Sequence, residues 1–410
     1  MKIRISSYIT EFFAALAIVI NSIQFLVFSL LGIDYDPETG GGLVAIVNVT
    51  LCLYTVAWVV YMELFGQRPI HSERWPYYLP VLVILSFFVE STIFKGIGIN
   101  TFSGKQFLFF GVAGVPAIYL ATYIYRHDRF DIITRNSDLI MLICTLALIL
   151  NLPNMLNGPA TIAGSGGHQE ISYGAAFCFG INWVNIITGN TTDRLPIFQR
   201  KIWRYISFAL LPLQSMICVL GGGRGGGVLL ILCFIVTIFM FSRQNFAKVM
   251  LWSVVAIGLI VLVAVQSGHF EEGFGRTFNY LEGGKISLDK DMSDIERAVL
   301  REKSYHIIGD SPVWGYGIWN GLKVAGFYMH NIFLDVLIAG GFIYLFIFLF
   351  IMKKVYKSAY NIITRDNKVV LLPWILYPST MLLFSGYYLS NSYFWFFTIY
   401  CFLKRKDYLK

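Results

Sequence analysis

A histidine and an arginine stand where this largely apolar sequence would not be expected to place charge. His330 lies where a long polar segment, residues 267–329, gives way to an apolar stretch. Arg224 interrupts a run of six glycines between two other apolar stretches. Ionisable groups at such positions are costly and often functional. A neutral imidazole can take a proton from a hydroxyl group, and a guanidinium fork suits phosphate oxygens. Together they predict a membrane enzyme acting on a phosphorylated, lipid-linked substrate.

Each of these residues also has a simpler interpretation. His330 could cap or border an apolar helix without taking part in chemistry, although the positive end of a helix dipole favours the neutral, base-competent ring. Arg224 could anchor an ordinary glycine-rich hairpin at a membrane interface. Asn331 and Asp335 are four residues apart and could hydrogen-bond on one helical face.

Two further arginines lie in the polar segment. Residues 293–296 have the capping-box pattern, so a short amphipathic helix should begin there and run to about Ile308. Arg297 and Arg301 would share one face of that helix. They would either bind an anionic group or snorkel toward lipid headgroups.

Composition predicts the elements that must position these residues. Hydrophobic residues make up 56% of the chain, charged residues make up 14%, and the mean hydropathy is +0.64. These values are far from those of a soluble domain. We therefore predict an all-α polytopic membrane protein, a single integral domain covering 1–410, with about twelve transmembrane helices. The predicted spans are 8–32, 43–65, 76–95, 106–125, 138–157, 170–188, 203–220, 224–242, 247–266, 330–352, 368–386 and 388–403.

The placement of Lys and Arg predicts the orientation. Most of the 32 basic residues fall in the segments that share one side with the N-terminus. By the positive-inside rule both termini are cytoplasmic, and the 267–329 loop faces outward. The net charge of +8 then marks membrane edges and does not indicate nucleic acid. The six cysteines fall inside apolar spans, which argues against a disulfide framework or a cysteine metal site.

The order of the motifs resembles that of the O-antigen polymerase/ligase family. The specific match covers roughly 221–345, whereas the N-terminal half matches only in hydropathy and number of spans. The elements that carry the resemblance are Arg224 among its glycines, Arg297, a Pro-x-x-Gly-x-Gly turn at 312–317, His-Asn-x-x-Leu at 330–334 and a glycine pair at 340–341.

The resemblance implies a glycosyltransferase with a GT-C-like fold in the bacterial inner membrane. It would act on the periplasmic side, without a metal or another cofactor. His330 would deprotonate the acceptor hydroxyl, while Arg224, Arg297 and Arg301 would bind the diphosphate of an undecaprenyl-linked donor. Family members often carry a further arginine in an earlier outward loop, which this chain lacks. Supporting roles are expected for Asn331, Asp335, His168, Arg276 and Lys303.

Polymerase and ligase share this signature and differ in their acceptor. A polymerase transfers the growing chain onto an undecaprenyl-diphosphate-linked repeat unit, and a ligase transfers the finished chain onto lipid A-core. The motif at His330 and the aromatic-rich N-terminal half favour the polymerase, and a role in capsule synthesis stays open. The resemblance implies as partners the lipid-linked donor and acceptor, membrane lipids and, as a further candidate, a chain-length regulator; no nucleic acid is expected.

Two other functions fit parts of the sequence. Asp34 and Asp36 form an Asp-x-Asp pair in the first outward loop, as in multi-span glycosyltransferases that hold a divalent metal on the lipid phosphate. Asp289 and Asp291 repeat the pattern, so chance is a competing explanation, and sensitivity to chelators separates the two mechanisms. A flippase for lipid-linked glycans would suit twelve spans. Such transporters usually show two related halves, and we find no internal repeat here.

Overall fold

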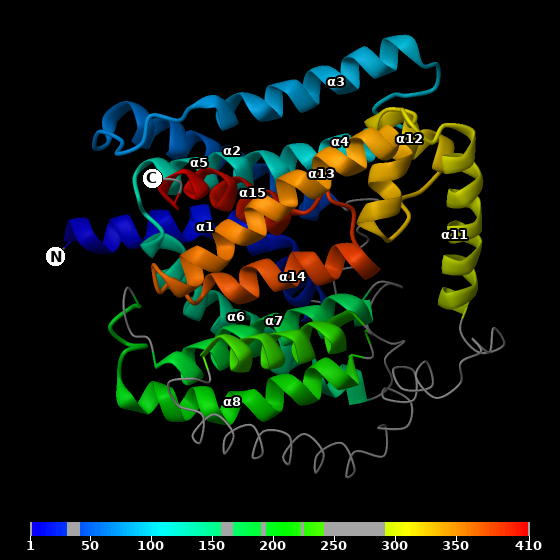
Figure 1. The fold of residues 1–410 in the computed structure, drawn as a ribbon. Coiled ribbons are helices and arrows are strands. Elements are labelled where there is room, and N and C mark those ends of the chain that lie inside the picture. Colours follow the sequence, from blue (N-terminus) through cyan, green and yellow to red (C-terminus); the bar gives the residue numbers. More distant parts are fainter. Residues whose placement is uncertain are drawn as a thin grey trace.

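The computed structural model describes residues 2–30, 42–156, 167–189, 194–221, 223, 225–241 and 292–408, and every regular element in them is a helix. Most helices run side by side along one axis (Figure 1). The two chain ends lie at one end of this bundle, and α11 stands at the opposite end, across the axis (Figure 1). The helices of the first half are α1 (Lys2–Leu30), α2 (Gly42–Phe65), α3 (Leu79–Ile93), α4 (Phe102–Phe109), α5 (Val115–Arg126), α6 (Asp131–Leu156), α7 (Gly167–Thr188) and α8 (Lys201–Leu220).

The second half of the chain supplies the rest of the bundle. An apolar helix covers Gly225–Phe241. The remaining helices are α11 (Met292–Asp310), α12 (Ile318–Ala325), α13 (Ile332–Thr364), α14 (Leu371–Phe384) and α15 (Ser392–Lys404). Helix α11 begins and ends within two residues of the helix predicted from the capping box.

Seven helices in the described part of the chain are long and apolar enough to cross a membrane. Shorter apolar helices include Tyr8–Ile20, Gly225–Phe241 and Leu371–Phe384. The described part of the chain is therefore all-helical, and its long apolar helices are those of a multi-pass membrane protein. The predicted span 247–266 lies outside the described residues. The count of twelve spans, and the compartment that each end faces, stay predictions.

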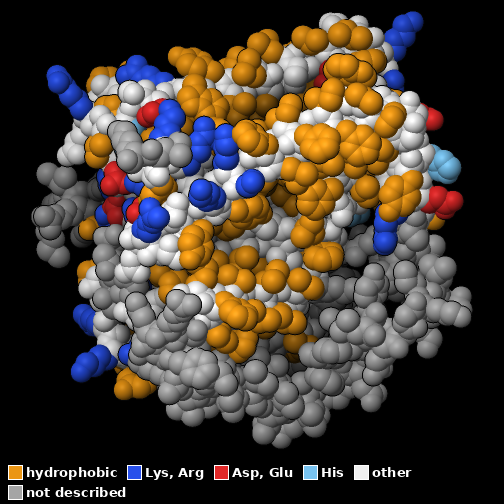
Figure 2. Space-filling model, viewed as in Figure 1, with side chains coloured by type: hydrophobic (Ala, Val, Ile, Leu, Met, Phe, Trp, Pro, Cys, Tyr) orange, Lys and Arg blue, Asp and Glu red, His pale blue; other side chains and the backbone are white. Residues whose placement is uncertain are grey.

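The burial of each helix follows its place in the bundle. Helices α5, α7 and α15 are almost wholly buried, as expected for helices that are apolar on every side and enclosed by others. The outer helices expose large apolar side chains, such as Phe65, Leu82 and Phe346. Hydrophobic side chains cover much of the face drawn in Figure 2, while Lys and Arg side chains gather toward the end that holds the termini.

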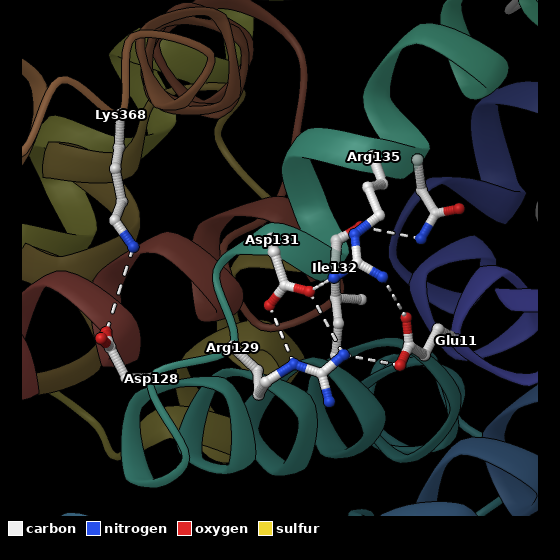
Figure 3. Close-up of polar contacts among 8 residues, drawn as sticks. Glu11, Asp128, Arg129, Asp131, Ile132, Arg135 and Lys368 are labelled. Carbon is white, nitrogen blue, oxygen red and sulfur yellow. Dashed lines mark hydrogen bonds and ion pairs between the residues drawn. The ribbon is translucent and has the colours of Figure 1, made fainter. Parts of the chain in front are cut away.

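Buried ion pairs join the helices at the end that holds the termini. Glu11 of α1 is only 3% exposed. It bonds to Arg129 at 2.7 Å and contacts Arg135 at 3.4 Å, and Asp131 bonds to the same two arginines (Figure 3). Removing one member of such a network would leave a buried charge without its partner. This network therefore ties α1 to the start of α6, at the far end from His330.

Candidate active site

Helix α13 is broken near its start at the glycine pair 340–341, where the backbone torsions leave the helical region. The break frees carbonyl groups before it and N–H groups after it, and all of them need new partners. The turn at 312–317 supplies these partners. The N–H of Gly317 donates to the carbonyl of Ala339 at 2.8 Å, and the N–H of Phe342 donates to a carbonyl of the turn at 2.8 Å. Two motifs that are separate in the sequence are thus halves of one structural unit.

Glycine is required on both sides of this contact. Gly315 has φ +64°, and a Cβ there would lie 2.5 Å from the backbone nitrogen of Gly340. Gly341 has φ +60°, and its Cβ would lie 2.3 Å from the carbonyl carbon of Val313. Side chains rarely adopt this left-handed conformation, and neither position has room for one. The backbone of the 312–317 turn therefore lies directly against the broken helix.

Helix α12 is held in place by one carboxylate from α3. Glu90 accepts hydrogen bonds from the backbone N–H groups of Ile318, Trp319 and Asn320 at 3.0, 2.9 and 2.9 Å. These are first-turn donors that have no partner inside the helix, and the helix dipole favours a negative charge beside them. The indole of Trp319 is fully buried and donates to Ser86 at 3.0 Å. Glu90 lies near the end of the predicted span 76–95, and nothing in the sequence indicated this contact.

The backbone of His330 is held in the left-handed region, with φ +52°. On one side, Asp335 accepts a hydrogen bond from the N–H of Met329 at 2.8 Å. On the other side, Asn331 caps α13 by accepting from the N–H of Phe333 at 3.0 Å. The predicted side-chain pair between Asn331 and Asp335 was therefore wrong, because Oδ1 of each side chain accepts from a backbone N–H group instead. The helix begins at Ile332, two residues after the histidine.

The ring of His330 is oriented by a backbone carbonyl. Its Nδ1 lies 3.1 Å from the carbonyl oxygen of Ser385, the residue that ends α14. A carbonyl can only accept a hydrogen bond, so Nδ1 carries the hydrogen and Nε2 of the neutral ring carries the lone pair. The ring also contacts Tyr328 edge-on, with 4.6 Å between centroids. This tautomer is suited to a general base that acts through Nε2.

Tyr173 of α7 brings the glycine-rich segment close to this histidine. Its hydroxyl lies 3.3 Å from the hydroxyl of Ser385, whose carbonyl contacts His330. A Cβ on Gly225 would lie only 1.8 Å from the same tyrosine hydroxyl, so that glycine rests directly on it. Arg224 itself lies outside the described residues. Gly225, which follows it, is connected to His330 through two residues, because it contacts Tyr173 and Tyr173 contacts Ser385. Neither Tyr173 nor Ser385 carried a sequence signal, because their significance depends on contacts between distant helices.

The glycines around Arg224 have a packing role. A Cβ on Gly223 or Gly226 would collide with Ser172 of α7, at 2.8 and 2.2 Å. The hydroxyl of Ser172 donates to the carbonyl of Gly223 at 2.9 Å. Gly227, in contrast, has nothing within 4 Å of its Cβ position. At Gly223, Gly225 and Gly226, therefore, helix α7 is the neighbour that excludes a side chain.

Residues 208–349 match the family model described as O-antigen ligase. Over this segment, about a third of its length, the chain is similar to the O-antigen polymerase/ligase family. The family consists of membrane glycosyltransferase-like enzymes that use lipid-linked saccharides. No curated protein and no solved structure matches the chain. The matched segment contains the glycine-rich run, the 312–317 turn, His330 and the break in α13.

The other residues predicted for a family site have different positions. Arg301 is exposed on α11. Lys303 donates to the carbonyl of Ala325 and so caps the end of α12, which is a structural contact. Arg297 lies in α11 and His168 lies in α7, but the structure does not describe their side chains. Arg276 lies outside the described residues.

Helix α11 is attached to the segment that carries the histidine. Ile307 is 8% exposed and packs in a small apolar cluster with Ala325, Met329 and Ile338. Val299, elsewhere on the surface of the same helix, is 59% exposed. The arginine-bearing helix therefore packs on the residue that precedes His330, which places α11 beside the candidate site.

Proposed function

We propose that the chain is a polymerase of O-antigen or a related surface polysaccharide. It transfers a glycan chain from undecaprenyl diphosphate onto an undecaprenyl-diphosphate-linked repeat unit, on the periplasmic face of the bacterial inner membrane. The observation that carries this proposal is the contact between Nδ1 of His330 and the carbonyl of Ser385. It presents Nε2 as the basic nitrogen, next to a glycine-rich segment whose arginine suits a diphosphate.

The reaction that these residues support is a single displacement at the anomeric carbon. The acceptor hydroxyl oxygen forms a bond to this carbon while Nε2 of His330 takes the hydroxyl proton. The bond from the anomeric carbon to the diphosphate oxygen breaks, and undecaprenyl diphosphate leaves with the electron pair. Arg224, Arg297 and Arg301 stabilise the developing negative charge, which cations do well in a water-poor site. In-line displacement inverts the anomeric centre, and His330 then releases its proton to solvent.

The second candidate is an O-antigen ligase, because the matched family model includes both polymerases and ligases and is described as O-antigen ligase. The chemistry at the histidine and the arginines would be the same. The acceptor would be a hydroxyl of lipid A-core instead of a lipid-linked repeat unit.

A lipopolysaccharide gel from a source strain that lacks this gene tests both candidates. Core with a single repeat unit supports the polymerase, and bare core with long polymer still on the carrier lipid supports the ligase. Complementation with the wild-type gene should restore the ladder of long-chain lipopolysaccharide bands on this gel, whereas the His330→Asn variant should not restore it. Asparagine tolerates the left-handed backbone and can donate to Ser385, but it is no base, so we expect a loss of about 100- to 10,000-fold.

Two further variants complete this test. Arg224→Ala should also abolish the product if it binds the diphosphate. His306→Ala is the matched control, because this histidine is exposed on α11. A normal ladder from well-expressed His330→Asn protein would refute the role of the base.

A further inference from the structure

A small pocket lies between α12 and the start of α13. One of its lining residues, Phe327, contacts the ring of His330. Its walls include three small residues, Gly321, Ala325 and Ala339, which leave the space open. Its polar and aromatic lining comes from Asp335, Phe327 and Tyr387. The pocket has room for about one water-sized group, so it suits a single hydroxyl and not a whole sugar ring.

Asp335, which lines this pocket, has one carboxylate oxygen that lacks a hydrogen-bond partner among the described residues. The side chain is only 6% exposed, and Oδ1 accepts from the N–H of Met329. Oδ2 is buried and has no hydrogen-bond partner within the described part of the chain. A buried acceptor without a partner is costly, and such atoms usually bind water or a ligand. The second oxygen is therefore available to a hydroxyl that enters the pocket.

A group of aromatic rings in mutual contact connects the pocket with the histidine. Phe327 lines the pocket, and its ring centroid lies 5.5 Å from that of His330. Phe327 stacks on Tyr328 at 4.4 Å and on Phe102 at 5.2 Å, and all three rings are half-buried. Sugar rings present apolar C–H faces and peripheral hydroxyls, which an aromatic face and a carboxylate match together. Burial raises the pKa of Tyr387 well above its ordinary value, so its phenol stays a neutral hydroxyl.

We propose that this pocket is a subsite for the acceptor sugar. Oδ2 of Asp335 accepts a hydrogen bond from one sugar hydroxyl, the sugar ring lies against Phe327 and Tyr328, and a neighbouring hydroxyl meets Nε2 of His330. The pocket thereby selects which hydroxyl is glycosylated. This inference rests on the proposed function, and it holds for a lipid-linked repeat unit and for lipid A-core alike, because both acceptors are saccharides.

The test uses the full-length protein in proteoliposomes with the lipid-linked repeat unit isolated from the deletion strain. Asp335→Asn keeps an oxygen for Met329 and places a donor where the free acceptor stood. We expect the apparent KM for the repeat unit to rise about 10- to 100-fold, with kcat changed far less. Ala325→Leu fills the pocket without touching the carboxylate and should raise KM by a similar factor. Val324→Leu, on the exposed side of the same helix, should leave both constants unchanged.

The possible outcomes separate the two proposals. Elongation with an unchanged KM in Asp335→Asn and Ala325→Leu would overturn the subsite and indicate a pocket that holds only water. A raised KM in Asp335→Asn alone would also overturn it, since the aspartate would then act only through Met329 and the position of His330. Wild type that transfers no sugar to either the repeat unit or lipid A-core would instead refute the proposed function.

Discussion

Replacing Glu90 with alanine should release α12 and, with it, the segment that carries His330. Glu90 is the acceptor for three consecutive N–H groups at the start of α12. Only four residues lie between Ala325, where α12 ends, and His330. A change 240 residues away from the histidine in sequence should therefore reduce activity.

The size of the effect follows from the contacts. A hydrogen bond to a charged group contributes about 1.5–3 kcal/mol. The three hydrogen bonds share one half-buried carboxylate, and water can replace part of them in the variant. We therefore expect Glu90→Ala to lower the local stability of α12 by about 3–4 kcal/mol in total, which is less than the sum of three separate bonds. Glu90→Gln keeps one acceptor oxygen and should cost about 1–2 kcal/mol.

Amide hydrogen exchange of residues 318–320 measures this local stability in the purified protein. At 1.4 kcal/mol per factor of ten, Glu90→Ala should accelerate exchange by about 100- to 1,000-fold, and Glu90→Gln by about 10-fold. Glu302→Ala is the matched control, because this glutamate is exposed on α11. Product formation should fall in the same order. Unchanged exchange and full activity in Glu90→Ala would refute the view that α3 holds the site together.

Two pairs of glycine variants test the close packing around the site. Gly225→Ala should abolish the product because the new Cβ would lie 1.8 Å from the Tyr173 hydroxyl, whereas Gly227→Ala, with nothing within 4 Å, should complement normally on the same gel. Equal activity of the two would contradict the packing argument. Gly341→Ala should lower the free energy of unfolding by about 2 kcal/mol or more, because it combines φ +60° with a clash, while Gly309→Ala meets nothing and should keep the wild-type Tm.

Much of the candidate site could be predicted because it depends on local chemistry. The capping box at 293–296 predicted a helix that the structure contains as α11, and apolar length predicted helices that the structure contains in the described segments. The order of Arg224, the 312–317 turn and His330 indicated the family that the comparison then supported. Such features depend on hydropathy and on spacing within one segment, which a single sequence displays directly.

The wrong expectations concern the partner that each polar group or glycine finds in the folded chain. The sequence showed that Asn331 and Asp335 could share a helical face, but only the folded turn around His330 brings the backbone N–H groups of Met329 and Phe333 to these side chains as competing donors. It likewise showed glycines near an arginine, but not that α7 would press against them.

By itself, then, the sequence determined the membrane class, the helical segments and the residue types available for acid–base and phosphate chemistry. Tertiary structure alone decided that Ser385 orients His330, that Tyr173 links this pair to Gly225 and that Glu90 holds α12. The physical reason is that hydropathy and helical period act within a segment. Partners far apart in the chain are chosen only when helix packing brings their unsatisfied donors and acceptors within reach of one another.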